Sequence, residues 1–489
     1  MGKKVSEILK RVFIHSVSGC DGVVVDGINY NSKKVKRGDI FVAIRGEKFD
    51  GNDFIEDAVR RGAVSILSER KRMLQNICWL QSEDVRKNMA EISNFIFDYP
   101  SEKLFTAGIT GTNGKTTIAY LLHHIFSKVG IEHGMTSTVE NISPARTETS
   151  IMTTPESPDI VKLMYETVME GGEAFFLEVS SHSIDFKRVW GILFDVAVFT
   201  NLTRDHLDFY ENMENYFASK LKLFVDYSPK NVVVNVDSQY GRRIFEVASG
   251  NKYSYGFSED AGYKITDFKS SHEGIFFKVK DIKGDTFEVK SKLFGRYNAL
   301  NILASLVVAK LYGIDFEDSI NAIGDFNGVK GRLEFVADKN GGKVYIDYAH
   351  TPDALKEVLN SVKNISKRGR LIVLFGAGGN RDREKRPLMG RVVCELSDFA
   401  IITSDNPRNE NPEDIIDEVK EGFFKDNYVV EIDRKNAIYK ALDMLEPGDV
   451  LILAGKGHED YQILKDGKIP FDERKIVFEY LEREGYETH

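Results

Sequence analysis

Short apolar runs alternate with segments of helical spacing through the middle of this chain. The apolar runs cover Phe105–Thr110, Phe175–Val179, Val196–Asn201 and Val232–Val236. Strands that alternate with helices form parallel sheets, and a strand buried on both faces is apolar along its whole length. The pattern therefore predicts a largely parallel sheet in this part of the chain.

The N-terminal part of the chain has shorter elements. An amphipathic helix is predicted over residues 5–13, and short strand-like runs follow at residues 23–26, 40–44 and 64–68. With one or two helices between them, these runs indicate a small α/β domain that ends near residue 100.

A second alternating series begins after Gly331-Arg332. Its apolar runs cover residues 344–347, 371–375, 400–403 and 450–454, and its helical segments begin at Pro352, Pro387 and Pro412. Proline is tolerated in a first helical turn, so the series predicts a doubly wound, Rossmann-like domain. We expect three α/β domains, over residues 1–103, 104–332 and 333–489.

Composition is that of a globular protein. The chain has 489 residues, enough for about three domains, and is 42% hydrophobic and 29% charged. A net charge of -9 argues against a surface that coats nucleic acid. No apolar run approaches the ~18 residues that span a membrane, so we expect a cytoplasmic protein that does not bind membrane. We also expect a monomer that binds small molecules and no nucleic acid.

The cysteines give no sign of a shared site. Cys20, Cys78 and Cys394 are odd in number, far apart and in apolar contexts. Disulfide and metal-cluster patterns need regular spacing. We therefore predict three core residues.

A glycine-rich turn follows the first strand of the middle domain. Gly111 and Gly114 allow backbone N–H groups to point at phosphate oxygens, Lys115 suits a β/γ-phosphate, and the Thr116 hydroxyl suits Mg²⁺. Thr112, Asn113 and Thr117 complete this predicted phosphate loop. Ile109 stands where the strict pattern has glycine, so a strand-turn-helix corner without a ligand remains an alternative.

Polar residues also end two further strands of this domain. Glu178 and His206 are candidate Mg²⁺ ligands beside the phosphate loop, although magnesium prefers oxygen. A capping or core histidine is the alternative. In the last domain, Asp347 and residues 376–380, 405–408 and 455–459 are predicted to meet at the carboxyl ends of the strands, where such sheets bind ligands.

Several separated motifs together resemble the Mur ligase family. They are TGTNGKTT (110–117), EVSSHSIDFKRV (178–189), FTNLTRDHLDF (199–209), GRYNALN (295–301), GRLE (331–334), YIDYAHTPDAL (345–355), FGAGGNRDREKRPLM (375–389), DNPR (405–408) and GKGHEDYQ (455–462). The resemblance covers essentially the whole chain. It implies ATP-dependent amide formation through an acyl phosphate, in peptidoglycan precursor synthesis.

The resemblance also implies how charge is balanced. ATP is the co-substrate and two Mg²⁺ ions assist the transfer, one held by Thr116 and Glu178 and the other by His206 and Lys220. Lys220 matches the lysine that the family carries as a carbamate, which turns a cation into an oxygen ligand. Without the resemblance, Lys220 would be taken for a solvated helix residue. Lys115, Glu178, His206 and Lys220 are the expected catalytic set.

Further contacts follow from the same resemblance. Asn298 and Asn301 would face adenine, with a role in the helix start as the alternative, and Arg332 and Asp347 would close the last domain over ATP. The implied contacts of UDP-N-acetylmuramoyl-L-alanyl-D-glutamate are Tyr30, Ser32, Glu47, Lys48, Phe49, Thr153, Thr154, Ser180 and Arg188. Phe186 replaces a glutamine that some relatives use.

The last domain would select the amino acid that is added. Arg408 fits the second carboxylate of meso-diaminopimelate, which L-lysine lacks. The remaining implied contacts are Arg381, Asp405, Asn406, Pro407, Gly455 and Glu459. Lysine or another diamino acid remains an alternative acceptor, and Asn411 stands where many relatives have Asp.

Three other functions are alternatives to this ligase. A folylpolyglutamate synthetase-like ligase would lack DNPR followed by GKGHEDYQ. A phosphate-loop NTPase switch would hydrolyse nucleotide without forming an amide, and would not need Glu178, His206 and Lys220 together. A dinucleotide-binding protein is suggested by residues 376–379, whose glycines lack the full GxGxxG spacing. Because the phosphate loop and Arg408 belong to different domains, the ligase also requires domain closure.

Overall fold

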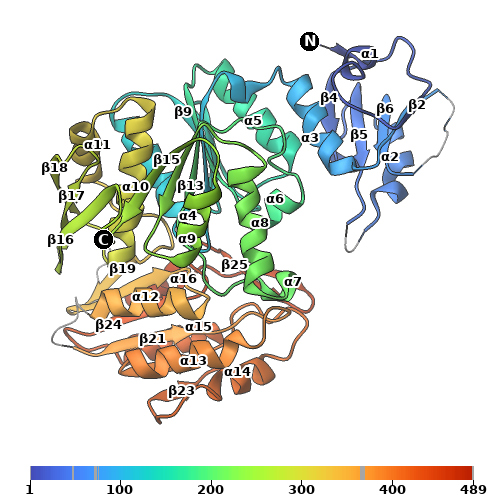
Figure 1. The fold of residues 1–489 in the computed structure, drawn as a ribbon. Helices are drawn as coiled ribbons and strands as arrows, with labels where there is room; N and C mark the ends of the chain where they lie inside the picture. Colours follow the sequence, from blue (N-terminus) through green and yellow to red (C-terminus); the bar gives the residue numbers. More distant parts are fainter. Residues whose placement is uncertain are drawn as a thin grey trace.

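The computed structural model describes residues 2–46, 49–70, 74, 76–271, 273–363 and 369–486. Figure 1 shows three α/β bodies: a small N-terminal one in blue, a large central one, and a C-terminal one in orange and red packed beneath the central one. This confirms the predicted fold class.

The N-terminal body is built on a five-stranded sheet of order β2-β7-β6-β5-β4, in which only β2 runs antiparallel to its neighbour. Its elements are β1 (Lys3–Lys4), α1 (Val5–Ile8), β2 (Ser16–Ser18), β3 (Val24–Val25), β4 (Gly27–Asn29), β5 (Asp39–Ala43), α2 (Ile55–Arg60), β6 (Ser65–Ser68), β7 (Cys78–Gln81) and α3 (Val85–Ile96). The predicted helix over residues 5–13 is wrong in its second half, because α1 ends at Ile8 and Phe13 is 78% exposed.

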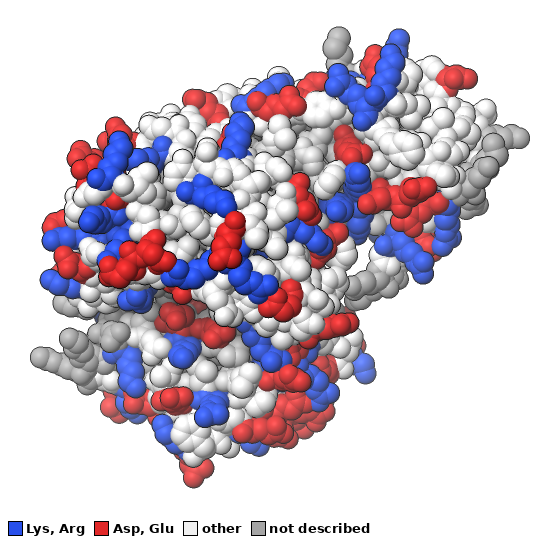
Figure 2. Space-filling view, in the orientation of Figure 1, with Lys and Arg blue, Asp and Glu red and all other residues white. Residues whose placement is uncertain are grey.

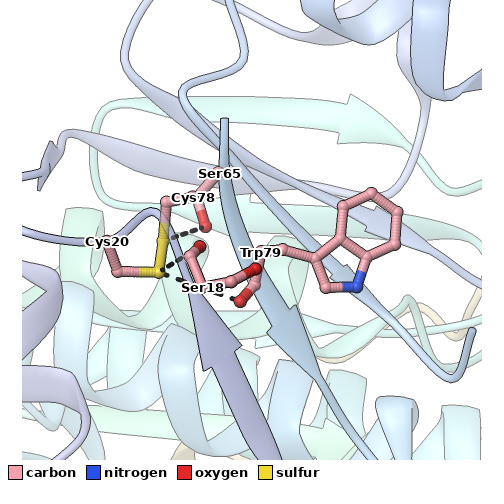
Figure 3. Close-up of a disulfide and its surroundings, with 5 residues drawn as sticks. All are labelled: Ser18, Cys20, Ser65, Cys78 and Trp79. Atoms are coloured by element: carbon pink, nitrogen blue, oxygen red, sulfur yellow. Dashed lines mark hydrogen bonds between the residues drawn. A yellow bond between two sulfur atoms is a disulfide. The ribbon is translucent and has the colours of Figure 1, made fainter. Parts of the chain in front are cut away.

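The prediction of three separate cysteines is also wrong. Cys20 and Cys78 form a disulfide, and Ser65 donates a hydrogen bond to Cys78 Sγ (3.2 Å) (Figure 3). The antiparallel pairing of β2 with β7 brings together two cysteines that are 58 residues apart. Spacing along the chain did not reveal this, since the pairing is tertiary. Cys394 is buried and free, as predicted.

The central body has an eleven-stranded sheet of order β11-β10-β9-β12-β8-β13-β14-β15-β16-β17-β18, parallel from β9 to β16 and antiparallel at both edges. Its strands are β8 (Phe105–Thr110), β9 (His133–Thr136), β10 (Glu140–Ser143), β11 (Arg146–Thr149), β12 (Ala174–Glu178), β13 (Val196–Phe199), β14 (Asn231–Asn235), β15 (Asn251–Gly256), β16 (Tyr263–Ser271), β17 (Gly274–Lys280) and β18 (Thr286–Ser291). The largely parallel sheet is confirmed. Because β12, β8 and β13 are neighbours, the residues that follow them meet at one edge.

Helices cover both faces of the central sheet. They are α4 (Lys115–Lys128), α5 (Ser157–Met169), α6 (Ser181–Asp185), α7 (Leu207–Tyr210), α8 (Met213–Val225), α9 (Gln239–Val247), α10 (Arg296–Tyr312) and α11 (Phe316–Ile323). Apolar side chains of α4, α10 and α11 form one buried core, and those of α5, α6, α8 and α9 form the other. The loops that carry the site are therefore anchored by well-packed elements.

The C-terminal body has a six-stranded sheet of order β19-β20-β24-β21-β22-β23, parallel except for β19. Its elements are β19 (Glu334–Lys339), β20 (Gly342–Asp347), α12 (Pro352–Lys363), β21 (Leu371–Phe375), α13 (Lys385–Leu396), β22 (Phe399–Ile402), α14 (Pro412–Lys420), β23 (Tyr428–Val430), α15 (Arg434–Asp443), β24 (Val450–Ala454), β25 (Tyr461–Leu464), β26 (Gly467–Pro470) and α16 (Glu473–Arg483). Helices α12–α14 pack on one face, and α15 and α16 on the other. The doubly wound domain is confirmed, except that α13 begins two residues before Pro387.

Charge is distributed without a dominant sign on the visible face. Figure 2 shows Lys and Arg side chains interleaved with Asp and Glu side chains over all three bodies. A polyanion-binding face would gather positive charge in one region. Among the described helices, none has the length and apolar character needed to cross a bilayer.

Candidate active site

The turn between β8 and α4 is shaped by close backbone contacts. Gly111 and Gly114 have φ of 144° and 93°. A Cβ at Gly111 would lie 1.9 Å from Thr200 Oγ1, and one at Gly114 would lie 2.5 Å from Asn301 Oδ1. Both positions therefore require glycine. Gly114 precedes the first residue of α4, so the turn leads directly into a helix N-terminus, where backbone N–H groups favour an anion.

Two lysines converge on one carbonyl of this turn. Lys115 Nζ donates to the Gly111 and Thr112 carbonyls (both 2.9 Å), and Lys220 Nζ donates to the Gly111 carbonyl (3.0 Å). Lys220 lies on α8, and its ammonium is 4.7 Å from the centre of the Tyr216 ring. The structure thus brings Lys220 to the phosphate loop, 109 residues along the chain from Gly111, although its sequence pattern alone suggested a solvated residue.

Burial controls the protonation of both lysines. Burial, followed by the charge of Lys115, places the pKa of Lys220 well below its ordinary value. Burial also lowers the pKa of Lys115, while the nearby Glu178 carboxylate opposes that change. The Lys220 amine is therefore disposed to lose its proton, which is the state that reacts with CO₂.

Glu178 is fully buried at the end of β12. Its carboxylate accepts hydrogen bonds from Thr138 N (2.7 Å), Thr138 Oγ1 (3.0 Å) and Thr116 Oγ1 (3.1 Å). Burial raises the pKa of Glu178, while Lys115 opposes the rise. Sequence reasoning missed Thr138, because it follows β9 in a loop that contains no phosphate-binding motif.

His206 lies near the same edge, in the left-handed region with φ of 55°. Its Nε2 is 3.4 Å from Asp205 Oδ2, and its ring lies 4.9 Å from the His182 ring. Burial lowers the pKa of His206 to about 3, although Asp205 opposes the change. Its imidazole is therefore neutral near neutral pH, which is the form that can bind a metal ion.

The donors around the phosphate loop fit magnesium in part. Glu178 and Thr116 offer oxygen atoms beside the turn, the ligand type that Mg²⁺ prefers. Across the described stretches of the chain, no three His, Cys, Asp or Glu side chains form a ready metal-binding cluster. The Thr116 hydroxyl and the Glu178 carboxylate would suit an ion whose other ligands are phosphate oxygens.

A cavity of about 660 Å³ lies between the phosphate loop, the start of α10 and the C-terminal body. Its lining includes the predicted residues Asn113, Gly114, Thr116, Thr117, Asn298, Asn301, Arg332 and Asp347. Phe257, Arg296 and His350 also line it and were not predicted. Arg332, the last residue before the C-terminal body, donates from its Nη2 to Thr116 Oγ1 (3.1 Å), so the junction of the two bodies lies against the phosphate loop.

The two asparagines lie at the start of α10 and in the cavity wall. Asn298 Nδ2 donates to the Phe294 carbonyl (2.8 Å), and Asn301 Nδ2 donates to Asn298 Oδ1 (3.0 Å). Both side chains are buried at the cavity wall. They organise the start of α10 and also border the space that a ligand would occupy.

A second polar group connects the central and N-terminal bodies. Thr154 Oγ1 donates to Ser180 Oγ (3.2 Å), and Arg188 donates to the Thr154 carbonyl (3.1 Å) and to Glu156 (3.0 Å). Arg86 on α3 donates to the same Glu156 carboxylate (3.0 Å). These contacts join Thr154, Ser180 and Arg188 as predicted and add Glu156 and Arg86.

Phe186 contacts both arginines of that group. The guanidinium carbons of Arg86 and Arg188 lie 4.9 and 5.6 Å from the centre of its ring. The aromatic ring therefore stabilises two cations by cation–π contact.

The other predicted residues of this region are spread over a wider surface. Thr153 Oγ1 accepts from Thr138 Oγ1 (3.2 Å), and Tyr30 Oη donates to Asp159 Oδ2 (2.6 Å). Ser32 is buried, and Phe49 is 71% exposed. Glu47 and Lys48 lie outside the described residues.

The predicted amino-acid loops converge at the carboxyl ends of β20, β21, β22 and β24. Arg408 donates to the Gly379 carbonyl (2.8 Å), and Gly455 N donates to the Asp347 carbonyl (3.0 Å). Asn406 Nδ2 donates to Glu459 Oε2 (3.0 Å). Burial, together with the neighbouring Arg381, lowers the pKa of Arg408. Pro407 lies between Asn406 and Arg408 in this loop. Asn411 accepts from Glu413 N (3.3 Å) as the cap of α14, so the departure from Asp preserves the cap.

The central and C-terminal bodies are joined next to these loops. Arg204 donates to Asp382 Oδ2 (3.0 Å) and Glu384 Oε2 (2.7 Å), and Arg381 lies 3.8 Å from Asp208. The two bodies are therefore in contact beside these loops. The sequence did not predict Arg204 or Asp382, because their ion pair forms only when the two bodies pack together.

Known protein families match the chain over three stretches. The Mur ligase family catalytic domain matches residues 24–105, the Mur ligase middle domain residues 109–309, and the Mur ligase glutamate ligase domain residues 331–457. A curated relative from Clostridium acetobutylicum is named UDP-N-acetylmuramoyl-L-alanyl-D-glutamate–2,6-diaminopimelate ligase 1. It is 41% identical over 481 residues, covering 98% of this chain and 99% of its own length.

Two further matches carry the same ligase name. A relative from Caldanaerobacter subterraneus subsp. tengcongensis is 42% identical over 470 residues, covering 96% of this chain and 97% of its own. A solved structure of such a ligase is 30% identical, covers the whole of both chains and has a TM-score of 0.68.

Proposed function

Because the chain belongs to the Mur ligase family, we propose that it is an ATP-dependent ligase that adds meso-diaminopimelate to UDP-N-acetylmuramoyl-L-alanyl-D-glutamate in peptidoglycan precursor synthesis. ATP phosphorylates the terminal carboxylate of the accepted peptide, which releases ADP. The amine of the amino acid attacks the resulting acyl phosphate, loses a proton and displaces phosphate, so that an amide forms. Nucleotide-linked substrates place this reaction in the cytoplasm.

The observation that carries this proposal is the contact between the central and C-terminal bodies beside the phosphate loop and the amino-acid loops. Arg204 contacts Asp382 beside Arg381, and Arg332 contacts Thr116 at the junction of the two bodies. An acyl phosphate must be shielded from water and meet an amine, and domain closure provides both conditions. Residues 1–103, 104–332 and 333–489 are proposed as the substrate, ATP and amino-acid domains.

ATP is proposed to occupy the cavity of about 660 Å³. Residues 111–117 would cradle the phosphates, and Lys115 would exchange its loop carbonyls for phosphate oxygens. Asn298 and Asn301 would face the base, while Arg332 and Asp347 would contribute from the C-terminal side.

Two magnesium ions are proposed, held by Thr116 and Glu178 and by His206 and carbamylated Lys220. Bound Mg²⁺ would offset repulsion between the γ-phosphate and the substrate carboxylate. The buried Glu178 carboxylate would hold the ion, and Thr116 and Thr138 fix the orientation of that carboxylate. The depressed pKa of Lys220 supports a carbamate at this position.

The nucleotide-linked peptide is proposed to lie along the contact of the central and N-terminal domains. Thr153, Thr154, Ser180 and Arg188 would hold its peptide arm, and Tyr30, Ser32 and residues 47–49 its uridine and diphosphate. In this structure Glu156 engages both Arg188 and Arg86. A substrate anion would therefore join an existing cluster of cations.

The acceptor is proposed to lie among Arg381, Asp405, Asn406, Pro407, Arg408, Gly455 and Glu459. Arg408 would bind the distal carboxylate of diaminopimelate in bidentate fashion. Its guanidinium is held by the Gly379 carbonyl, which fixes the direction of that contact.

Isotope transfer tests the reaction directly. With ¹⁸O in the reacting carboxylate, one ¹⁸O atom should leave in each phosphate released, and no transfer should occur without that substrate. ATP hydrolysis that is independent of both substrates and leaves the label in place would indicate the NTPase switch instead.

A further inference from the structure

The acceptor loops enclose a fully buried ammonium. Lys456 follows β24 and is 0% exposed, and its Nζ lies 3.1 Å from Asn406 Oδ1, 3.2 Å from Glu459 Oε2 and 3.3 Å from Asp405 Oδ1. All three partners belong to the proposed acceptor site, whereas Lys456 was assigned no role in it. Burying a charge is costly unless it is paired, so both carboxylates bind this cation strongly.

Lys456 reduces the negative charge that the two carboxylates present to a ligand. Asp405 and Glu459 share one ammonium, and Asn406 also donates to Glu459. Although burial raises the pKa of Asp405, Lys456 and Arg434 reverse that effect and keep the carboxyl ionised. Much of the negative charge in the pocket is therefore neutralised from within the protein.

The positive charge of the pocket is less compensated. Within the part of the chain that the structure describes, Arg408 donates to the carbonyls of Gly379 and Asn406 and forms no ion pair, and its neighbour Arg381 is 3.8 Å from Asp208. A ligand carboxylate would meet Arg408 without first displacing an acidic side chain. The pocket therefore favours an acceptor whose distal end is a zwitterion over one whose distal end is only cationic.

We propose that Lys456 is a positioning residue that sets the acceptor preference, holding Asp405 and Glu459 and neutralising enough of their charge for the pocket to prefer an amino acid with a second carboxylate. The inference rests on the proposed function, since it assumes that these loops bind the acceptor. Lys456 acts through its two carboxylate partners and need not touch the substrate.

The test compares kcat/KM for meso-diaminopimelate and L-lysine in Lys456→Met, in Lys456→Arg and in a matched control, Lys339→Met. Lys339 is also buried in the C-terminal domain, but it donates to the Leu442 carbonyl far from the acceptor loops. Lys456→Met should lower the diaminopimelate-to-lysine ratio by at least about tenfold, mainly through KM, because an unpaired carboxylate then attracts a cation. Lys456→Arg and Lys339→Met should keep most of the ratio.

A second comparison covers the case in which Lys456→Met does not fold. Glu459→Gln removes negative charge and should not lower the ratio, even if it slows both acceptors. Lys456→Met/Glu459→Gln restores the charge balance and should recover part of the ratio. An unchanged ratio in Lys456→Met, or a fall in Glu459→Gln, would overturn the proposal. A wild-type enzyme that joins neither amino acid would instead refute the proposed function.

Discussion

Arg204 Nε lies 3.0 Å from Asp382 Oδ2, across the contact between the central and C-terminal domains. Arg204 is two residues before His206, and Asp382 directly follows Arg381. One ion pair thus connects the proposed metal side of the reaction with the proposed acceptor side. Asp382 is 8% exposed and Arg204 29% exposed, so solvent screens the pair only in part.

Breaking this pair should impair acceptor use more than ATP binding. We expect Asp382→Asn to lower kcat/KM for the acceptor by about tenfold, because the closed arrangement loses a charged contact, with little change in nucleotide affinity. Steady-state kinetics with each substrate varied in turn measures both effects. The swapped pair Arg204→Asp/Asp382→Arg should recover part of the loss, and an equal fall in nucleotide affinity would contradict the account.

Glu178→Gln should abolish turnover while leaving the fold intact. A buried carboxylate that is replaced by an amide can no longer balance magnesium, so we expect a loss of at least about a hundredfold in kcat. Thr138→Val, which removes one donor to Glu178, should cost less. Full activity in Glu178→Gln would remove this residue from the proposed site.

The same substitution has a pH signature. The pKa of Glu178 is raised in the folded state by burial, so the folded state binds more protons than the unfolded state between the unfolded and folded pKa values, and stability from this group falls as pH rises through that window. The Tm of Glu178→Gln relative to wild type should therefore be higher at about pH 7.5 than at about pH 4.5. Thermal unfolding at both pH values measures this, and a reversed order would contradict the direction of the shift.

Lys220→Ala should lose activity that an added small carboxylate or bicarbonate partly restores. The buried amine contacts the phosphate loop through the Gly111 carbonyl, and its lowered pKa favours carbamate formation. Lys222→Ala is the matched control, because Lys222 lies on the same helix but pairs with Asp185 at the surface. An unimpaired Lys220→Ala enzyme would exclude the catalytic role, and mass spectrometry at low temperature tests for the added CO₂.

The Cys20–Cys78 bond should appear in a non-reducing peptide map. Its 58-residue separation means that the bond restricts a long loop in the unfolded chain, so reduction should lower stability by about 2–4 kcal/mol. Catalysis should persist, since the bond lies in the N-terminal domain, far from the phosphate loop along the chain. Three free thiols in the unreduced protein would contradict the structure.

Local patterns predicted the elements whose signals are local. The strand Phe105–Thr110, the glycines at 111 and 114 and the helix start at Pro412 were all predictable, because burial on both faces, left-handed φ and a fixed proline φ each restrict residue choice. The four amino-acid loops followed from the rule that ligands bind at the carboxyl ends of parallel strands.

Tertiary partners could not be predicted in this way. Thr138 acts on Glu178 from another strand, Lys456 acts through residues on a neighbouring loop, and Cys20 meets Cys78 only through strand pairing. Glu156 was also missed, because its position between Arg86 and Arg188 depends on how two domains pack. In each case the contact joins residues that are far apart in the chain, so no short stretch of the sequence indicates it.

The central claim is tested most directly by a competition experiment. The enzyme receives ATP, Mg²⁺, UDP-N-acetylmuramoyl-L-alanyl-D-glutamate and equal concentrations of meso-diaminopimelate and L-lysine, and the products are weighed by mass spectrometry while ADP is counted. We predict one diaminopimelate adduct per ADP and little lysine adduct. Predominant lysine adduct would contradict the proposed roles of Arg408 and Lys456, and ADP without either adduct would contradict the ligase itself.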